Sequence, residues 1–137
     1  MPSLVNTATQ GPEKGDDVRG PQACWVGDLE LDDVPGVTVR GEIDINSAEA
    51  LEDALQRAII ASTGAFVIDL TEVEFLDSSG LAVLLRARGL LGREDRPLAV
   101  VLPPGPARRA FEVAGFADMF VTYTSRAEAE NALVPVD

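Results

Sequence analysis

The chain has 137 residues, of which 46% are hydrophobic and one is a cysteine, and its formal net charge is −12. The length suits one domain with a buried core, and the single cysteine excludes an internal disulfide, so we expect a cytoplasmic protein. The negative charge disfavours nucleic acid and membrane surfaces as partners, because both are anionic. No apolar run approaches the ~20 residues that span a bilayer.

The first part of the chain differs in composition from the rest. Residues 1–22 are rich in Gly, Pro, Asp, Gln and Thr and show no hydrophobic periodicity. They contain no apolar stretch of the signal-peptide type, and their composition is typical of disorder. We therefore predict a disordered acidic tail at 1–22, followed by one domain at 23–137.

Two short alternating segments predict a β-hairpin. Leu29 and Leu31 alternate with acidic residues, and residues 37–40 alternate between apolar and polar. Between them, residues 33–36 read Asp-Val-Pro-Gly. Proline fixes φ and glycine tolerates a positive φ, so we predict that the turn lies at 33–36.

A helix is predicted soon after Asp44, with Asn46 or Ser47 as its N-cap and with capping-box spacing from Asn46 to Glu49. Its apolar residues recur with a period of 3.6 and predict one buried face, formed by Ala48, Leu51, Leu55, Ala58 and Ile59. Gly64 ends this helix. Residues 65–70 follow as an apolar run, which is typical of a central strand covered on both faces.

The later elements follow from the same signals. They are a helix from the serines at 78–79 to about Gly92, a strand at 97–102, a helix from Pro106 to Gly115, a strand at 121–123, and a helix opened by a capping box at 125–128. The order is β-β-α-β-α-β-α-β-α, in which helical crossovers require parallel strands after the antiparallel hairpin. The sequence predicts an α/β fold with a mixed sheet of four to five strands packed against about four helices.

The helix after the serines carries two apolar stripes. One contains Leu81, Leu84 and Leu85, and the other contains Val83, Ala87 and Leu90. Such a helix is either packed on both stripes inside the core or leaves apolar surface exposed for a protein partner. The sequence leaves both interpretations open.

The most informative motif is Asp-Ser-Ser-Gly-Leu at 77–81, because it places serine hydroxyls at a helix N-terminus, where unpaired amides favour negative charge. Such a hydroxyl can cap the helix, attack a substrate or accept a phosphate. A nucleophilic serine needs a base, but the chain has no histidine, and its only lysine, Lys14, lies in the predicted tail. The motif also lacks the Gly-x-Ser-x-Gly frame of a nucleophile elbow. We therefore predict no catalytic residue and no enzyme.

A phosphoaspartate receiver centred on Asp77 is also disfavoured. That chemistry needs a divalent metal held by clustered carboxylates, and a cation beside the phosphoryl group. Asp32 and Asp33 are expected near the hairpin turn, at the opposite end of the strand from the serines, and the predicted domain contains no lysine. No metal site is predicted, and helix capping and phosphorylation remain as interpretations of the serines.

A phosphate on such a serine would add about −1.5 to −2 charges. The helix amides would tolerate this group, so the fold should survive the modification. A partner packed over the same spot would face an uncompensated charge, and a 100-fold loss of affinity needs only about 2.7 kcal/mol. Phosphorylation of a serine is therefore a plausible binding switch.

Over about residues 29–134 the chain resembles the bacterial anti-sigma factor antagonists built on a STAS domain. Three motifs in order carry this resemblance: Gly-Glu-Ile-Asp at 41–44, Asp-Ser-Ser-Gly-Leu at 77–81 after an apolar strand, and Arg108-Arg109 followed by Gly115-Phe116 and Phe120. The resemblance implies a STAS-like mixed sheet and a partner-switching function. Glu49 departs from the proline that many relatives carry in the first helical turn, which affects the start of the helix more than switching.

In that family the unphosphorylated antagonist binds an anti-sigma factor that is also a serine/threonine kinase, and this binding frees a sigma factor. The resemblance implies that the kinase phosphorylates Ser78 and that the modified antagonist is released until a serine phosphatase resets it. It further implies partner contacts at Asp44, Asp77, Ser79, Gly80 and Leu81, with no cofactor in the chain itself. The alternative is a STAS-type scaffold or ligand-sensing module whose serines cap a helix and are never modified.

Overall fold

The protein was analysed as a computed structural model, in which residues 24–133 are described. The predicted tail at 1–22 lies outside these residues. The described elements occur in the predicted order, with one additional 3-10 turn, Ala117–Met119. They are β1 (Cys24–Leu31), β2 (Val34–Ile43), α1 (Ala48–Ile60), β3 (Phe66–Leu76), α2 (Ser78–Arg93), β4 (Leu98–Val101), α3 (Pro106–Ala114), β5 (Val121–Tyr123) and α4 (Arg126–Leu133).

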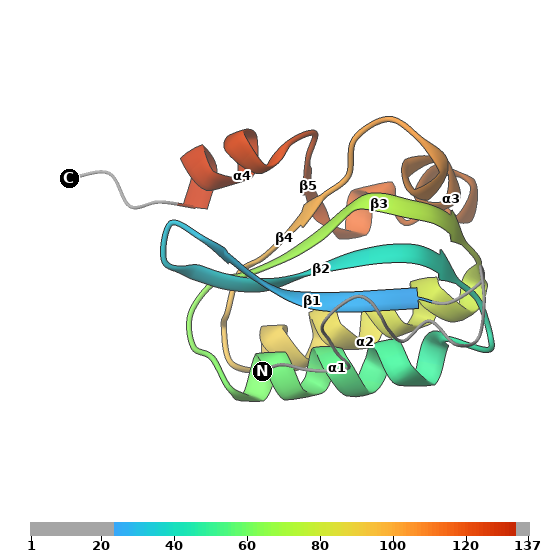
Figure 1. The fold of residues 1–137 in the computed structure, drawn as a ribbon. Helices are drawn as coiled ribbons and strands as arrows, with labels where there is room; N and C mark the ends of the chain where they lie inside the picture. The colour runs from blue at the N-terminus through green and yellow to red at the C-terminus, as the bar shows by residue number, and fades with distance from the viewer. Residues whose placement is uncertain (1–23, 134–137) are drawn as a thin grey trace.

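The five strands form one mixed sheet in the order β1-β2-β3-β4-β5. β1 and β2 are antiparallel, and every later neighbouring pair is parallel (Figure 1). This arrangement confirms the predicted mixed α/β fold. It also means that the carboxyl ends of β2 and β3 meet at the same end of the sheet, where α1 and α2 begin.

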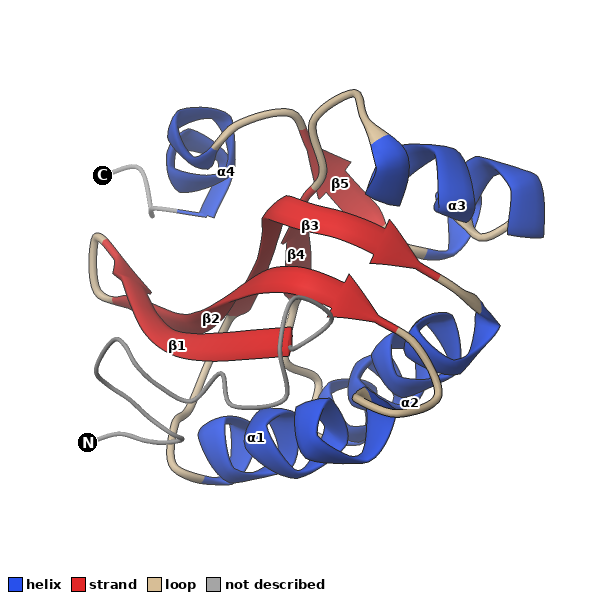
Figure 2. Ribbon diagram, turned by 45° about the vertical axis from the view of Figure 1, so that its right-hand side comes forward, coloured by secondary structure: helices blue, strands red, loops and turns tan. Residues whose placement is uncertain are grey.

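Helices cover the two faces of the sheet unequally. α1 and α2 lie side by side under one face, whereas α4 lies on the other (Figure 2). The main core cluster joins buried residues of β2 and β3, such as Val39 and Ile68, to Leu51 and Leu55 of α1 and to Leu84 of α2. A smaller cluster under α4 contains Leu31, Val67, Ala99, Val101 and Ala129. The central strand therefore contributes to both clusters, as its continuous apolar run predicts.

The predicted hairpin turn at 33–36 was wrong, because the observed turn lies earlier in the chain. The turn consists of Asp32 and Asp33 alone, because Leu31 pairs with Val34 across the hairpin. Both aspartates have positive φ, at 52° and 73°, as a two-residue hairpin turn of the primed type requires. The glycine of the predicted turn, Gly36, lies inside β2 instead. A Cβ at Gly36 would lie 2.1 Å from the Val67 carbonyl oxygen, so this glycine permits the close approach of β2 to β3.

The strand leading to the serines is longer than predicted. β3 runs from Phe66 to Leu76, whereas the sequence predicted a strand at 65–70. The second half reads Thr-Glu-Val-Glu-Phe-Leu and pairs with β2 through irregular register near Arg40 and Gly41. As a result β3 continues to within one residue of α2.

Side chains hold two helix ends, one by contacts that the sequence did not predict and one by a predicted capping box. Arg96 is buried and donates to the carbonyl oxygens of Ile59 at 2.8 Å and Gly64 at 2.7 Å, so it satisfies acceptors where α1 ends. At α4, the Ser125 hydroxyl accepts from the Glu128 amide at 3.1 Å, as the capping box predicts. The Glu128 carboxylate reaches back to the amide of Thr124, one residue earlier than in a standard box.

One ion pair ties α4 to the centre of the sheet. Asp69 of β3 is only 1% exposed, and its carboxylate accepts from Arg126 at the first turn of α4 and from Thr71. A buried carboxylate is unfavourable unless it is paired and hydrogen-bonded, and these contacts supply both conditions. Asp69 therefore has a structural explanation.

Candidate functional site

The serine motif lies at the carboxyl end of β3. The strand ends at Leu76, the helix begins at Ser78, and only Asp77 separates them. Ser78 is exposed and Ser79 is half-buried. A tight strand-to-helix junction therefore presents the Ser78 hydroxyl to solvent on a rigid support.

Asp77, and neither serine, caps α2. Its carboxylate Oδ1 accepts from the amides of Ser79 at 2.9 Å and Gly80 at 3.4 Å. Within residues 24–133 the hydroxyls of Ser78 and Ser79 have no hydrogen-bond partner. The interpretation of the serines as helix caps is thus wrong for this junction. The amides of Ser79 and Gly80 thus already donate to the Asp77 carboxylate and are not free to bind a phosphate on Ser78.

The structure brings Asp44 to the same end of the sheet as the serines. Ile43 and Leu76 are paired in the last register position of β2 and β3, and the Asp77 amide donates to the Ile43 carbonyl oxygen at 3.1 Å. The loop that follows Ile43 and the loop that precedes Ser78 therefore lie side by side (Figure 2).

Hydrogen bonds within this loop fix its shape. The Asp44 carboxylate Oδ1 accepts from the amides of Asn46 at 2.9 Å and Ser47 at 3.3 Å. The Ser47 hydroxyl accepts from the Asp44 amide and donates to the Glu42 carbonyl oxygen, both at 3.0 Å. Ser47 is the N-cap residue of α1, as one of the two predicted options, but its side chain makes no capping bond to the helix. Its hydroxyl holds the loop instead.

Gly80 and Leu81 lie beneath the surface of the junction. A Cβ on Gly80 would lie 2.5 Å from Ile43 Cγ2 and 2.5 Å from Leu76 Cδ1, and the Leu81 side chain is buried in the main core. Because these residues are covered, they support the junction from below. The exposed surface that a partner could contact consists of their neighbours.

Most of the two predicted apolar stripes of α2 is packed inside the core. Leu81, Val83, Leu84 and Ala87 are buried, whereas Leu85 and Leu90 are half-buried. The stripes therefore form no exposed apolar patch at the serine end of the helix. Apolar surface at this end of the sheet comes from two residues that sequence reasoning missed. Ile45 is 76% exposed and Phe75 is 47% exposed. Ile45 stands between polar residues just after β2 ends, and Phe75 precedes the buried Leu76 at the end of β3. Alternation alone does not distinguish such positions from core positions.

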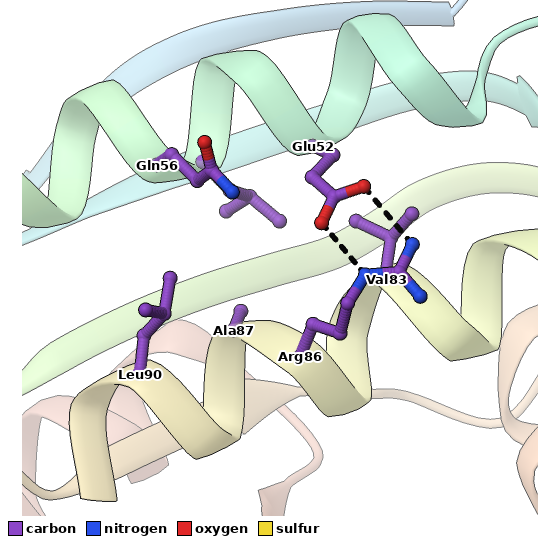
Figure 3. A pocket seen from close by; sticks show the side chains of 7 residues that line it. Glu52, Gln56, Val83, Arg86, Ala87 and Leu90 are labelled. Atoms are coloured by element: carbon purple, nitrogen blue, oxygen red, sulfur yellow. Dashed lines mark hydrogen bonds and ion pairs between the residues drawn. The ribbon is translucent and has the colours of Figure 1, made fainter. Parts of the chain in front are cut away.

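A bidentate ion pair bridges α1 and α2 beside a small cavity (Figure 3). The Glu52 carboxylate accepts from Arg86 Nε at 2.6 Å and Nη2 at 2.9 Å. These hydrogen bonds, more than the Coulomb attraction between the two charges, lower the pKa of Glu52 and raise that of Arg86. The pair closes the outer side of the gap between the two helices.

Asp32 and Asp33 lie in the hairpin turn, at the opposite end of β2 from Asp77, as the argument against a phosphoaspartate receiver required. Within residues 24–133 no cluster of three or more Asp, Glu, Cys or His side chains is arranged to hold a metal ion. The described helices also include none that is long and apolar enough to cross a membrane.

Comparison with known proteins decides the family. The family model described as "Mlab, STAS domain" matches residues 28–122, which is more than half of the chain. The chain belongs to the STAS-domain family. This STAS protein is 30% identical over 112 residues to the anti-sigma-F factor antagonist RsfB of Mycobacterium tuberculosis, covering 82% of the chain and 91% of RsfB. The resemblance to anti-sigma factor antagonists is therefore confirmed.

Solved structures support the same assignment. A crystal structure of an anti-sigma factor antagonist from Mycobacterium paratuberculosis matches with a TM-score of 0.76 and 35% identity, covering 83% of this chain and 97% of that one. The unphosphorylated form of the antagonist SpoIIAA shares the fold, with a TM-score of 0.64 and 18% identity over 82% of this chain and all of SpoIIAA. The predicted STAS-like sheet is confirmed.

Proposed function

We propose that this STAS protein is a cytoplasmic anti-sigma factor antagonist controlled by phosphorylation of Ser78. Its unphosphorylated form binds an anti-sigma factor that is also a serine/threonine kinase, and this binding frees a sigma factor. Phosphorylation of Ser78 releases the antagonist, and a serine phosphatase restores it. The observation that carries this proposal is the exposed Ser78 hydroxyl, which has no hydrogen-bond partner within residues 24–133 because Asp77 caps the helix.

The chain supplies only the acceptor for the chemistry. The Ser78 oxygen attacks the γ-phosphorus of ATP, the bond between that phosphorus and the bridging oxygen breaks, and ADP leaves. The serine proton passes to a base of the kinase, which also supplies Mg²⁺. The phosphatase step transfers the phosphoryl group to water and regenerates the hydroxyl. This cycle requires no catalytic residue from the chain itself, which contains no histidine.

Electrostatics at the junction favour release of the phosphorylated form. A phosphate adds about −1.5 to −2 charges beside the Asp77 carboxylate. That carboxylate already uses the amides of Ser79 and Gly80, so the phosphate has fewer donors to compensate it than a free helix N-terminus would offer. Burying an uncompensated phosphate under a partner opposes binding, and about 2.7 kcal/mol is enough for a 100-fold loss of affinity. Asp44, Asp77 and Ser79, which are half-buried, are the proposed partner contacts around the exposed Ser78.

Binding and mass measurements on the same variants test this function. With the partner kinase purified, Ser78→Ala should bind as wild type does and should not gain the ~80 Da of a phosphate when ATP is added. Ser78→Asp should bind at least about 10-fold more weakly. Ser125→Asp is a matched control, because Ser125 also stands at a helix N-terminus but belongs to α4 on the other face of the sheet. Wild-type affinity of Ser78→Asp, or phosphorylation of Ser78→Ala at an unchanged level, would contradict the proposal.

A further inference from the structure

Ile45 is an apolar side chain held out into solvent by a well-bonded loop. It is 76% exposed, although its two neighbours are joined by a hydrogen bond from the Asn46 amide to the Asp44 carboxylate at 2.9 Å. The Asp44 carboxylate accepts hydrogen bonds from two amides of this loop, and the Ser47 hydroxyl donates to the Glu42 carbonyl oxygen. An exposed isoleucine on such a loop loses little conformational entropy when it docks, which is the property of a preformed anchor.

Phe75 lies near the end of β3, the strand that pairs with β2, and the loop that carries Ile45 follows β2. Phe75 is 47% exposed and pairs with Glu42 in the register of β2 and β3, one position before the pair of Ile43 and Leu76. The Asp77 amide donates to the Ile43 carbonyl oxygen, so the segments that carry Ile45 and Phe75 meet at this end of the sheet, with Ile45 two residues after Ile43 and Phe75 two residues before Asp77. Ser78 follows Asp77 immediately. We call Ile45 and Phe75 the apolar pair.

The segments that carry the apolar pair are strongly acidic. Residues 41–53 and 73–82 contain no lysine, arginine or histidine, and their carboxylates are Glu42, Asp44, Glu49, Glu52, Asp53, Glu74 and Asp77. Only Glu52 of these forms an ion pair with a described residue, Arg86. A second copy of the chain would bring like charges together at this surface, so self-association is disfavoured. A basic surface on a different protein is complementary to it.

We infer that the apolar pair docks into an apolar pocket on a protein partner and that lysine or arginine side chains surround that pocket. This inference rests on the proposed function, in which the partner is the anti-sigma factor kinase. It assigns Ile45 as the main anchor and the surrounding carboxylates as the polar rim of the interface. It also explains why the switch would lie at Ser78, since a phosphate there would adjoin the apolar centre of the contact, where it would be desolvated.

The chain offers a matched control for the anchor. Ile60, at the end of α1, is 82% exposed and thus presents the same side chain to solvent away from the junction. The partner is first identified by mass spectrometry as the protein that wild type retains from lysate, and it is then purified and titrated against each variant. Ile45→Ala should lower the affinity at least about 10-fold, Ile60→Ala should not change it, and Phe75→Ala should lower it by a smaller factor. Both isoleucine variants should keep the thermal midpoint of wild type, because their side chains are exposed.

Ionic strength tests the basic rim. The affinity of wild type should fall as NaCl rises from about 50 mM to about 500 mM, because salt screens exposed charges. An affinity that is independent of salt or rises with it would overturn the basic rim. Equal affinities of Ile45→Ala and wild type, or equal losses in Ile45→Ala and Ile60→Ala, would overturn the anchor. A wild-type dimer that Ile45→Ala dissociates would assign the apolar pair to a second copy and also overturn the inference.

The two proposals fail in different ways. Weak binding of Ser78→Asp with unchanged binding of Ile45→Ala would leave the phosphorylation switch standing and remove the anchor. Weak binding of Ile45→Ala with unchanged binding of Ser78→Asp would keep the docking surface and remove the switch.

Discussion

The Asp77 carboxylate accepts a hydrogen bond from the amide of Ser79 at 2.9 Å, two residues further along the chain. Asp77 therefore caps α2, and neither of the neighbouring serines does. Asp77, which belongs to the motif at 77–81, thus contributes to stability, and this contribution can be measured separately from binding.

Replacing Asp77 should therefore destabilise the fold. Asp77→Ala removes the acceptor for two helix amides, and we expect the free energy of unfolding in urea to fall by about 1 kcal/mol. Asp77→Asn keeps an acceptor oxygen and should lose less. Asp53→Ala is the control, because Asp53 is exposed in the interior of α1 and caps no helix. Equal stability of Asp77→Ala and wild type would show that the cap contributes nothing.

Glycine at position 80 should be required for packing. In Gly80→Ala the new Cβ would lie 2.5 Å from atoms of both Ile43 and Leu76, so we expect a loss of about 1–3 kcal/mol in the free energy of unfolding. Gly89→Ala on the same helix has nothing within 4 Å of its new Cβ and should gain up to about 1 kcal/mol from helix propensity. Opposite signs for the two glycines in urea denaturation are the expected result. A stabilised Gly80→Ala would mean that the junction relaxes around the methyl group.

A substitution in the hairpin turn should raise the free energy of unfolding. Asp32 and Asp33 both adopt positive φ, which is unfavourable for most residues with a Cβ. Replacing the pair by Asn-Gly should raise the free energy of unfolding by about 0.5–1 kcal/mol, since this dipeptide favours the primed turn. Asp53→Gly in the interior of α1 should instead lower it by about 0.3 kcal/mol, since aspartate is only slightly better than glycine in a helix. A loss of stability in the Asn-Gly variant would contradict the turn geometry.

The ion pair between α1 and α2 should make stability depend on pH. Hydrogen bonds from Arg86 hold the pKa of Glu52 below its ordinary value of 4.5. A carboxyl whose pKa is lower in the folded state contributes stability that is complete above about pH 4.5 and is lost as the pH falls through the folded-state pKa.

Thermal midpoints from about pH 3 to about pH 7 check this contribution. The difference between wild type and Glu52→Gln should be largest near neutral pH and should shrink in acid. Glu112→Gln on α3 is the control, because Glu112 is exposed and has no ion-pair partner among residues 24–133. A difference that persists undiminished at the acid end would rule out the pair as its source.

The sequence predicted the order of elements because core-facing positions carry a clear period. The 3.6-residue stripe of α1 and the continuous apolar run at the start of β3 each identify their element without tertiary information. β5 was predicted at its observed bounds, Val121–Tyr123. The Pro106 start and the Gly115 end of α3 were also confirmed, since both residues have strong conformational preferences.

What the sequence missed depends on contacts between distant segments. Gly36 reads as a turn residue, but its role is set by the Val67 carbonyl of another strand. The second half of β3 contains Glu72 and Glu74, so it lacks the continuous apolar run that identifies the first half. It is nevertheless a strand, because it pairs with β2. At the candidate site, the motif located Ser78 and Asp77 correctly at the junction. It did not show that Asp77 engages the amides or that Ile45 points outward, because both depend on how two loops meet.

The position of α4 decides how this protein can be handled in binding work. The helix is fixed to β3 through Asp69 and Arg126 and lies at the opposite end of the sheet from the start of α2 (Figures 1 and 2). A fluorophore or resin linkage placed near Leu133 would therefore lie away from Ser78. The same linkage on the exposed residues of the loop before α1 would sit in the path of an incoming protein.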